Sequence, residues 1–193
     1  MNVYDFDNTI YDGESVLDFY LFALKKQPRL ISVLPKLCHM LIRYKACKIS
    51  YDELLLVAEK YAAKVLGMAD FSLLVSDFWD KNQKKIKKFY LDRRQSDDVI
   101  ISASWSFLIE EVCRRLGIKW VIASEIELTT GQIKRLCFKE KKVQFFREQF
   151  PEAVIDKFYT DSMNDAPMIS IAKRAFLVKG EKVEEINVKN HSY

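Results

Sequence analysis

The sequence predicts an α/β fold: a doubly wound parallel sheet forms the core, and an all-helical cap domain is inserted after the first strand. Three observations support this prediction. Short apolar runs rich in β-branched residues each end where polar residues begin, as buried parallel strands do. Helical patterns separate these runs. A long stretch without a convincing strand, residues 12–94, follows the first run.

The core follows from the runs in chain order. The expected strands cover residues 2–6, 99–103, 119–123, 155–160 and 174–178. The expected helices between them cover residues 105–116, 142–150 and 166–173. Gly117 follows the first helix, where a left-handed C-cap is expected. Residues 125–136, with Thr130-Gly131 near the middle, are typical of a hairpin. This alternation predicts a Rossmann-like core, whose site lies beyond the carboxyl ends of the strands.

The inserted stretch reads as about four helices. One begins after Ser50, because Glu53 three residues later completes a capping box. Another is the charged segment 81–94. We therefore expect two domains, a catalytic α/β core formed by residues 1–11 and 95–193 and a helical cap formed by residues 12–94.

Composition narrows the class of protein. The chain has 193 residues, 49% of them hydrophobic and 30% charged, as in soluble globular proteins. Its cysteines lie far apart in the sequence, which predicts reduced thiols: Cys38, Cys47, Cys113 and Cys137. No apolar run reaches the roughly 18 residues of a spanning helix, and the first strand leaves no room for a targeting segment. We expect a cytoplasmic protein, with peripheral attachment at the inner membrane surface as an alternative.

Acidic and phosphate-binding residues follow the strands. Asp5 and Asp7 end the first strand, and residues two apart in a strand point to the same side. Ser102 ends the second strand, where its hydroxyl can donate to a phosphate oxygen. Lys142 opens a helix, so its ammonium and the helix N-terminus both favour an anion.

Two further carboxylates complete the constellation. Asp161 ends the fourth strand and Asp165 comes at the start of the next helix. Three carboxylates with water oxygens suit Mg²⁺, and no His or Cys cluster competes for a metal. In a doubly wound sheet these strand ends meet in one crevice.

Four motifs now resemble a known family. They are Asp5-Phe6-Asp7-Asn8-Thr9, Ile101-Ser102-Ala103-Ser104, Lys142, and Asp161-Ser162-Met163-Asn164-Asp165. Their order and spacing resemble the haloacid dehalogenase superfamily of phosphatases, and the form of the fourth motif resembles its phosphoserine-phosphatase-like branch. The helical insertion after the first motif is where this superfamily places one class of cap.

The resemblance implies a role for each residue. Asp5 is expected to be the nucleophile and Asp7 the general acid and base. Asp5, the backbone carbonyl of Asp7, and Asp161 are expected to hold Mg²⁺, with Asp165 binding through water or as an anchor. Ser102 and Lys142 are expected to neutralise the phosphoryl oxygens. Asn164 is an additional candidate for phosphate contact.

Each residue also has a structural interpretation. Asp161 and Asp165 are compatible with a helix cap and a first-turn acid, and Ser102 with a turn. Lys142 lies beside Lys139 and Lys141, so the choice among the three lysines stays open, and the Gly that often precedes the family's lysine is replaced by Lys139. The joint occurrence of the residues, in this order, favours function.

The substrate is less sharply defined. Glu14 falls seven residues after Asp7, where phosphoserine phosphatases carry a glutamate that recognises the substrate amine; a first-turn helix acid is the structural alternative. No arginine clearly matches the residue that would hold a substrate carboxylate, with Arg43 the only candidate.

The segment 28–44 suggests a lipid-borne phosphate. A basic and polar stripe crosses a largely apolar helix, at Arg29, Ser32, Lys36, His39 and Arg43. Such a stripe is typical of a segment at an anionic membrane surface, and the segment resembles the cap of bacterial phosphatidylglycerophosphate phosphatases. The alternative is a cap helix whose apolar face packs on its neighbours.

The function predicted is therefore a magnesium-dependent phosphomonoester hydrolase, acting on a phosphorylated small molecule or a lipid phosphate. Nucleic acid is excluded as a partner, because a pI of about 8.7 is low for a nucleic-acid-binding domain. Two alternatives from other classes are a phospho-receiver domain and a catalytically inactive protein at the membrane surface. A receiver has no need of an acid at Asp7, which argues against it.

Overall fold

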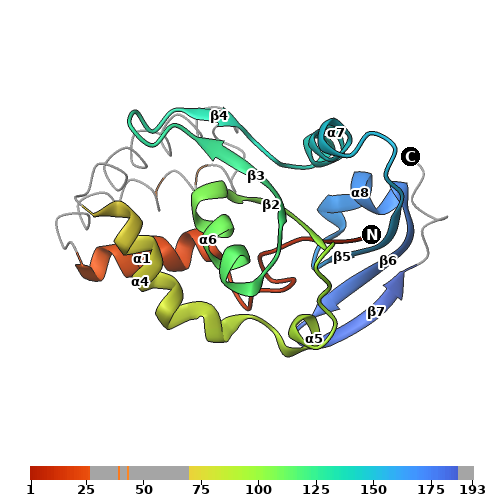
Figure 1. Cartoon of the computed structure of the whole chain (residues 1–193), viewed down its shortest axis with the longest axis horizontal. Helices are drawn as coiled ribbons and strands as arrows, with labels where there is room; N and C mark the ends of the chain where they lie inside the picture. The colour runs from red at the N-terminus through yellow and green to blue at the C-terminus, as the bar shows by residue number, and fades with distance from the viewer. Residues whose placement is uncertain (27–38, 40–42, 44–69, 187–193) are drawn as a thin grey trace.

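The computed structural model describes residues 1–26, 39, 43 and 70–186 (Figure 1). Its elements in chain order are β1 (Asn2–Tyr4), α1 (Ser15–Lys26), α4 (Phe71–Asn82), η2 (Gln83–Lys85), α5 (Lys88–Leu91), β2 (Val99–Trp105), α6 (Ser106–Leu116), β3 (Trp120–Ile126), β4 (Ile133–Arg135), α7 (Glu140–Gln149), β5 (Ile155–Thr160), η3 (Met163–Asp165), α8 (Ala166–Ile171), β6 (Ala172–Lys179) and β7 (Lys182–Ile186). Strands and helices alternate along most of the core, and the predicted α/β fold class is confirmed.

The strands form one sheet in the order β4-β3-β2-β1-β5-β6-β7. Its five inner strands are parallel, and β1 lies between β2 and β5, with Tyr4 opposite Ile100 on one side and Tyr159 on the other. Because the inner strands run the same way, the segments that follow β1, β2 and β5 leave the sheet at one edge. The expected hairpin is present, since β4 pairs antiparallel with β3. Strand β7, which pairs antiparallel with β6, was not predicted.

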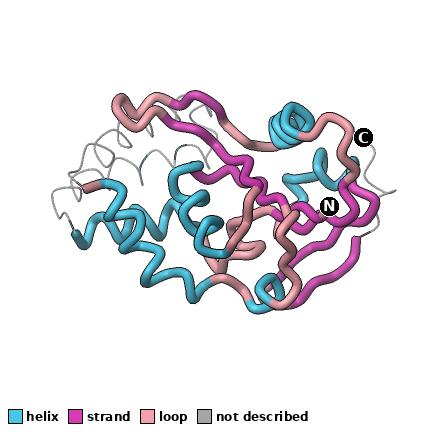
Figure 2. Tube along the Cα trace, in the orientation of Figure 1, coloured by secondary structure: helices cyan, strands magenta, loops and turns pink. Residues whose placement is uncertain are grey.

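Alternating side chains of the strands separate the core into two layers. Val3 and Ile101 face the layer that contains Phe145 and Phe146 of α7. Tyr4 and Ile100 belong to the other layer, whose helical side chains come from α1, α4, α5 and α6. Figure 2 shows the strands between these two groups of helices. Burial on both faces explains why the strands read as continuous apolar runs in the sequence.

The predicted helix over residues 81–94 is wrong. Helix α4 ends at Asn82, and the chain is extended at Ile86 and Lys87 before the short α5. Ile86 makes an antiparallel bridge with Tyr11, and the Lys87 N–H donates to the Ile10 carbonyl at 2.8 Å. These tertiary hydrogen bonds override the helical propensity of the lysine-rich sequence. The chain returning from the insertion is therefore bound to the loop that follows β1.

The C-cap prediction is confirmed, because Gly117 has a φ of 73° after α6. Cys113 and Cys137 are buried free thiols, while Cys38 and Cys47 lie outside the described residues. The capping box at Ser50 and most of the segment 28–44 also lie outside them; only His39 and Arg43 of that segment are described, both helical and exposed. Among the described helices, none is long and apolar enough to cross a membrane. The division into core and cap stays a prediction.

Candidate active site

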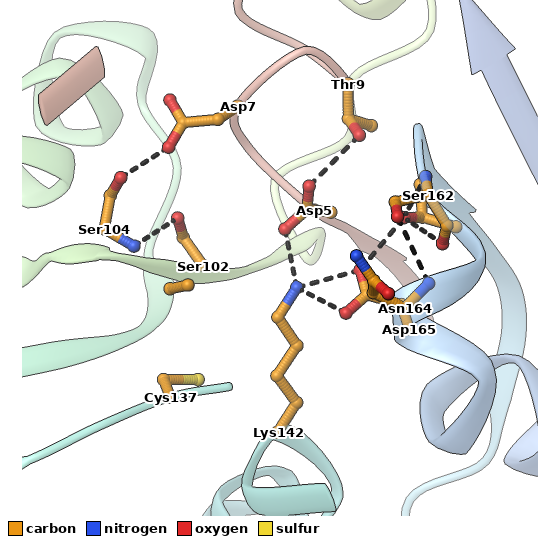
Figure 3. A network of polar contacts seen from close by, with 12 residues as sticks. Asp5, Asp7, Thr9, Ser102, Ser104, Cys137, Lys142, Ser162, Asn164 and Asp165 are labelled. Atoms are coloured by element: carbon orange, nitrogen blue, oxygen red, sulfur yellow. Dashed lines mark hydrogen bonds and ion pairs between the residues drawn. The ribbon is translucent and has the colours of Figure 1, made fainter. Parts of the chain in front are cut away.

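The segments that leave β1, β2 and β5 bring the predicted site residues together (Figure 3). Asp5 follows β1 directly, and Asp161 follows β5. Ser102 does not end the second strand as predicted, because β2 continues to Trp105 past a shift of register after Ile101. Lys142 is the third residue of α7, and Asp165 immediately precedes α8. Residues from five parts of the chain thus converge at one edge of the sheet, as the motif order predicted.

A buried lysine links two of the carboxylates. The Lys142 ammonium lies 2.7 Å from Asp5 Oδ1 and 2.8 Å from Asp165 Oδ1. All three residues are buried, with exposed fractions of 8% for Asp5, 3% for Lys142 and 5% for Asp165. Figure 3 shows the ammonium directed between the two carboxylates. Of the three neighbouring lysines, the structure therefore brings Lys142 to Asp5.

Two threonine hydroxyls complete the contacts of these carboxylates. Thr9 Oγ1 donates to Asp5 Oδ2 at 3.2 Å, and Thr160 Oγ1 donates to Asp165 Oδ2 at 2.9 Å. Neither threonine was predicted as a site residue, although Thr9 belongs to the first motif. Asp5 is thus held at both oxygens, one by a cation and one by a neutral donor.

Burial and charge act against each other in this cluster. Burial raises the pKa of the Asp5 carboxyl, and the neighbouring Lys142 ammonium opposes that rise. Burial lowers the pKa of Lys142, but the carboxylates of Asp5 and Asp165 outweigh it and hold the pKa above its usual value. Lys142 therefore stays charged at neutral pH. Burial also raises the pKa of Asp161.

Asp7 points to a different set of partners. Its Oδ1 accepts from the backbone N–H of Ser15 at 2.7 Å, and its Oδ2 accepts from the Ser104 hydroxyl. Figure 3 shows the Asp7 carboxylate turned toward Ser104, whereas Asp5 faces Lys142. Burial raises the pKa of Asp7, and the hydrogen bonds from Ser104 and Ser15 partly offset the rise. Both of these hydrogen-bond partners of Asp7 are therefore neutral groups.

Ser102 is almost fully buried, with 1% of its surface exposed. Its Oγ accepts a hydrogen bond from the Ser104 N–H at 3.0 Å. The hydroxyl proton of Ser102 is therefore left for another acceptor, which suits a phosphate oxygen. Ser15 and Ser104 were not predicted as site residues, although Ser104 belongs to the second motif.

The turn after Asp7 has an unusual backbone. Asn8 has a φ of 55°, a left-handed conformation in which asparagine is tolerated better than most residues. Its carbonyl accepts from the Lys87 ammonium, and its amide donates to Glu14 Oε1 at 2.6 Å. Glu14, predicted to recognise a substrate amine, is therefore engaged with Asn8 in this structure. Gly13, with a φ of 132°, allows the turn to close before α1.

Asn164 lies at the exposed rim of the site. It belongs to η3, immediately before Asp165, and its backbone N–H donates to Ser162 Oγ at 3.1 Å. Figure 3 shows Asn164 beside Asp165. Its predicted contact with phosphate stays a prediction.

The donor types fit Mg²⁺, because the carboxylates of Asp5, Asp161 and Asp165 and the carbonyl of Asp7 are all hard oxygen ligands. Within the described residues, however, no group of three or more Asp, Glu, His or Cys side chains is arranged to hold a metal ion. The Lys142 ammonium instead neutralises Asp5 and Asp165.

Comparisons with solved structures show that the fold is shared. A protein of unknown function from Bordetella pertussis Tohama I has a TM-score of 0.73 and 18% identity, covering 91% of this chain and 87% of its own. A phosphoserine phosphohydrolase-like protein from Francisella tularensis has a TM-score of 0.56 and 19% identity, covering 91% and 86%. A structure described as a phospho-aspartyl intermediate analogue of phosphoserine phosphatase has a TM-score of 0.52 and 14% identity, covering 90% and 83%.

Sequence comparison is more specific. A search of curated proteins found no match. The family model of the haloacid dehalogenase-like hydrolases, in contrast, matches residues 3–170, which include all four predicted motifs. The predicted hydrolase class is thereby confirmed, while the resemblance of segment 28–44 to phosphatidylglycerophosphate phosphatases stays a prediction. The chain belongs to the haloacid dehalogenase-like hydrolase family.

Proposed function

We propose that this hydrolase is a magnesium-dependent phosphomonoesterase that forms an aspartyl-phosphate on Asp5. The observation that carries the proposal is the buried contact of Asp5 Oδ1 with Lys142 at 2.7 Å, at the edge of the sheet where Ser102 also lies. A carboxylate beside a fixed cation and a hydroxyl donor suits attack on an anionic phosphate, because both donors can neutralise the phosphoryl oxygens.

The reaction has two steps. In the first, an Asp5 oxygen forms a bond to phosphorus, the ester P–O bond breaks, and Asp7 gives its proton to the leaving alkoxide. In the second, a water oxygen attacks the same phosphorus, Asp7 takes the water proton, and the bond from phosphorus to Asp5 breaks. Inorganic phosphate leaves, and both carboxyl groups return to their initial states.

Mg²⁺ would be held by Asp5, the carbonyl of Asp7, and Asp161, with Asp165 as an outer anchor, and it would neutralise phosphoryl charge. The oxygen-only donor set and the family assignment both support this choice. The aspartyl-phosphate route is supported by the likeness in fold to a phosphoserine phosphatase described as a phospho-aspartyl intermediate analogue.

The proposed substrate class is a phosphorylated small molecule or a lipid-borne phosphate. We propose that the helical cap, residues 12–94, determines which substrate class binds, because it follows the nucleophile directly in the sequence. Phosphoserine is the second candidate, favoured by Glu14, whose carboxylate lies next to the turn that carries Asp7. A phospho-receiver is disfavoured because a receiver needs a long-lived aspartyl-phosphate. Asp7 would instead activate the water that hydrolyses it.

A simple experiment tests the proposal. Asp5→Asn should lower hydrolysis of p-nitrophenyl phosphate by at least about a thousandfold, since the nucleophile is lost. Chelation of Mg²⁺ should abolish activity, and added Mg²⁺ should restore it. Asp156→Asn is the matched control, because this carboxylate contacts Lys173 at 2.8 Å, at the opposite end of β5 from the site. Substantial activity of Asp5→Asn, or activity that survives chelation, contradicts the proposal.

The substrate class requires a separate comparison of phosphoserine, sugar phosphates, nucleotides and phosphatidylglycerophosphate, with and without anionic vesicles. If vesicles neither bind the protein nor raise its activity, the lipid-phosphate option is excluded. A preference for phosphoserine would favour the second candidate.

A further inference from the structure

The strand β2 and the first turn of α1 meet at the carboxylate of Asp7. Ser104 Oγ donates to Asp7 Oδ2, and the Ser15 hydroxyl donates to Ser104 Oγ at 3.1 Å. The Ser15 backbone N–H donates to the other oxygen of Asp7 at 2.7 Å. Ser15 and Ser104 are buried, with exposed fractions of 0% and 6%. A short chain of hydrogen bonds therefore ends on the proposed acid and base.

In this chain of hydrogen bonds each serine hydroxyl donates its single proton to the next group. The Ser15 hydroxyl gives its proton to Ser104, and Ser104 is thereby oriented to give its own proton to Asp7. Buried hydrogen-bonded groups of this kind hold one another in a single geometry. Figure 3 shows the result: the Asp7 carboxylate lies against Ser104 and away from Lys142.

Ser104 also contacts the proposed phosphate donor through its backbone. Its N–H donates to Ser102 Oγ at 3.0 Å, while its side chain contacts Asp7. One residue thus orients both Ser102 and Asp7. A substitution of the Ser104 side chain leaves the backbone contact to Ser102 available and removes the side-chain contacts to Asp7 and to the Ser15 hydroxyl.

From these contacts we infer that Ser104 is a positioning residue for Asp7, and that it sets where Asp7 exchanges protons. This inference rests on the proposed function, because it concerns the proton transfers that the proposed reaction assigns to Asp7. Ser104 itself exchanges no proton with substrate. Its hydroxyl restricts Asp7 to the position from which water is deprotonated.

The aryl substrate p-nitrophenyl phosphate separates the two steps. Nitrophenolate is a stable leaving group, so formation of the aspartyl-phosphate needs little help from an acid, whereas hydrolysis of the intermediate still needs a base. Loss of the Ser104 hydroxyl should therefore slow the second step more than the first. The phosphoenzyme should then accumulate, which a general loss of folded protein would not produce.

The test measures steady-state kinetics and the phosphorylated fraction of acid-quenched protein by intact mass. Ser104→Ala should lower kcat by about tenfold to a hundredfold, the range expected for one lost hydrogen bond to a charged group. KM should fall with kcat because hydrolysis of the phosphoenzyme becomes rate-limiting, so kcat/KM should change much less. The phosphorylated fraction should rise above that of the wild type. Ser104→Thr, which keeps the hydroxyl, should restore both, and Ser15→Ala should have a smaller effect because its backbone N–H remains. Ser106→Ala is the control and should behave as wild type, because Ser106 is the first residue of α6 and is only half-buried.

The outcomes separate the two proposals. If Asp5→Asn stays active, the proposed function is wrong whatever Ser104 does. If Asp5→Asn is inactive but Ser104→Ala keeps the kcat and phosphorylated fraction of the wild type, only the positioning role is overturned. Should Ser104→Ala fail to fold, Ser104→Cys gives the same test, because the thiol keeps the volume but donates a weaker hydrogen bond.

Discussion

The two aspartates of the first motif differ in their surroundings, although they lie only two residues apart. Asp5 faces a buried ammonium 2.7 Å away, and that ammonium also contacts Asp165. Asp7 contacts a backbone N–H and a serine hydroxyl. Burial raises the pKa of both carboxyls; a cation opposes the rise at Asp5, whereas hydrogen bonds from neutral groups oppose it at Asp7. The difference suits one carboxylate to attack and the other to proton exchange.

The largest effect is expected from replacing Lys142, the cation that contacts Asp5 and Asp165. Lys142→Met should lower activity by about a hundredfold to a thousandfold, because a preorganised donor to the phosphoryl oxygens is lost. It should also lower the free energy of unfolding by about 3–5 kcal/mol, since two buried carboxylates lose their cation. Kinetics and urea unfolding measure the two effects.

Lys141→Met is the matched control for that variant. Lys141 is exposed and its ammonium contacts Gln144 at 2.9 Å, away from Asp5. The Lys141→Met substitution should therefore change neither the activity nor the free energy of unfolding appreciably. Loss of activity in Lys141→Met with an active Lys142→Met would show that the wrong lysine has been assigned to the phosphate.

For Asp7, whose direct partners are neutral, a comparable loss of activity but a smaller loss of stability is expected. Asp7→Asn should lower turnover by about a hundredfold to ten-thousandfold, the range for general acid and base catalysis. Stability should change much less than for Lys142→Met, because the asparagine oxygen can still accept from the Ser15 N–H while its NH2 group can donate to Ser104 Oγ. Intact mass after acid quenching should show a phosphorylated population. A variant of Asp7 that turns over like the wild type contradicts its role.

The smallest effect is expected at Glu14. Glu14→Gln keeps an oxygen acceptor for the Asn8 amide, so p-nitrophenyl phosphate hydrolysis should change by less than about threefold. If Glu14 also recognises a substrate amine, KM for phosphoserine alone should rise. An equal change in KM for phosphoserine and for an amine-free phosphate ester would assign Glu14 to the turn only.

Much of the core was predictable because its strands are buried on both faces. Val99, Ile100 and Ile101 face opposite layers yet are all apolar, so the run is visible without knowledge of its neighbours. Asp5, Ser102, Lys142 and Asp165 were predictable for a related reason: each stands where an apolar run or a helical pattern begins or ends.

The features that could not be predicted from the sequence depend on contacts between residues that are far apart in the chain. Ser104 belongs to the second motif, but no local pattern links it to Ser15, whose hydroxyl contacts it across 89 positions of sequence. The extended chain at Ile86 follows from its bridge to Tyr11, which no local pattern encodes. Strand β7 is exposed along much of its length, so it lacks the apolar run that marks the inner strands.

The most direct test is chemical identification of the phosphorylated residue. The enzyme, turning over p-nitrophenyl phosphate with Mg²⁺, is quenched and treated with borohydride, which reduces an aspartyl-phosphate to homoserine, and the peptides are then mapped by mass spectrometry. Homoserine at position 5, and its absence when substrate is omitted, is the predicted result. Reduction at another carboxylate, or none at Asp5 during active turnover, would contradict the assignment of Asp5 as the nucleophile.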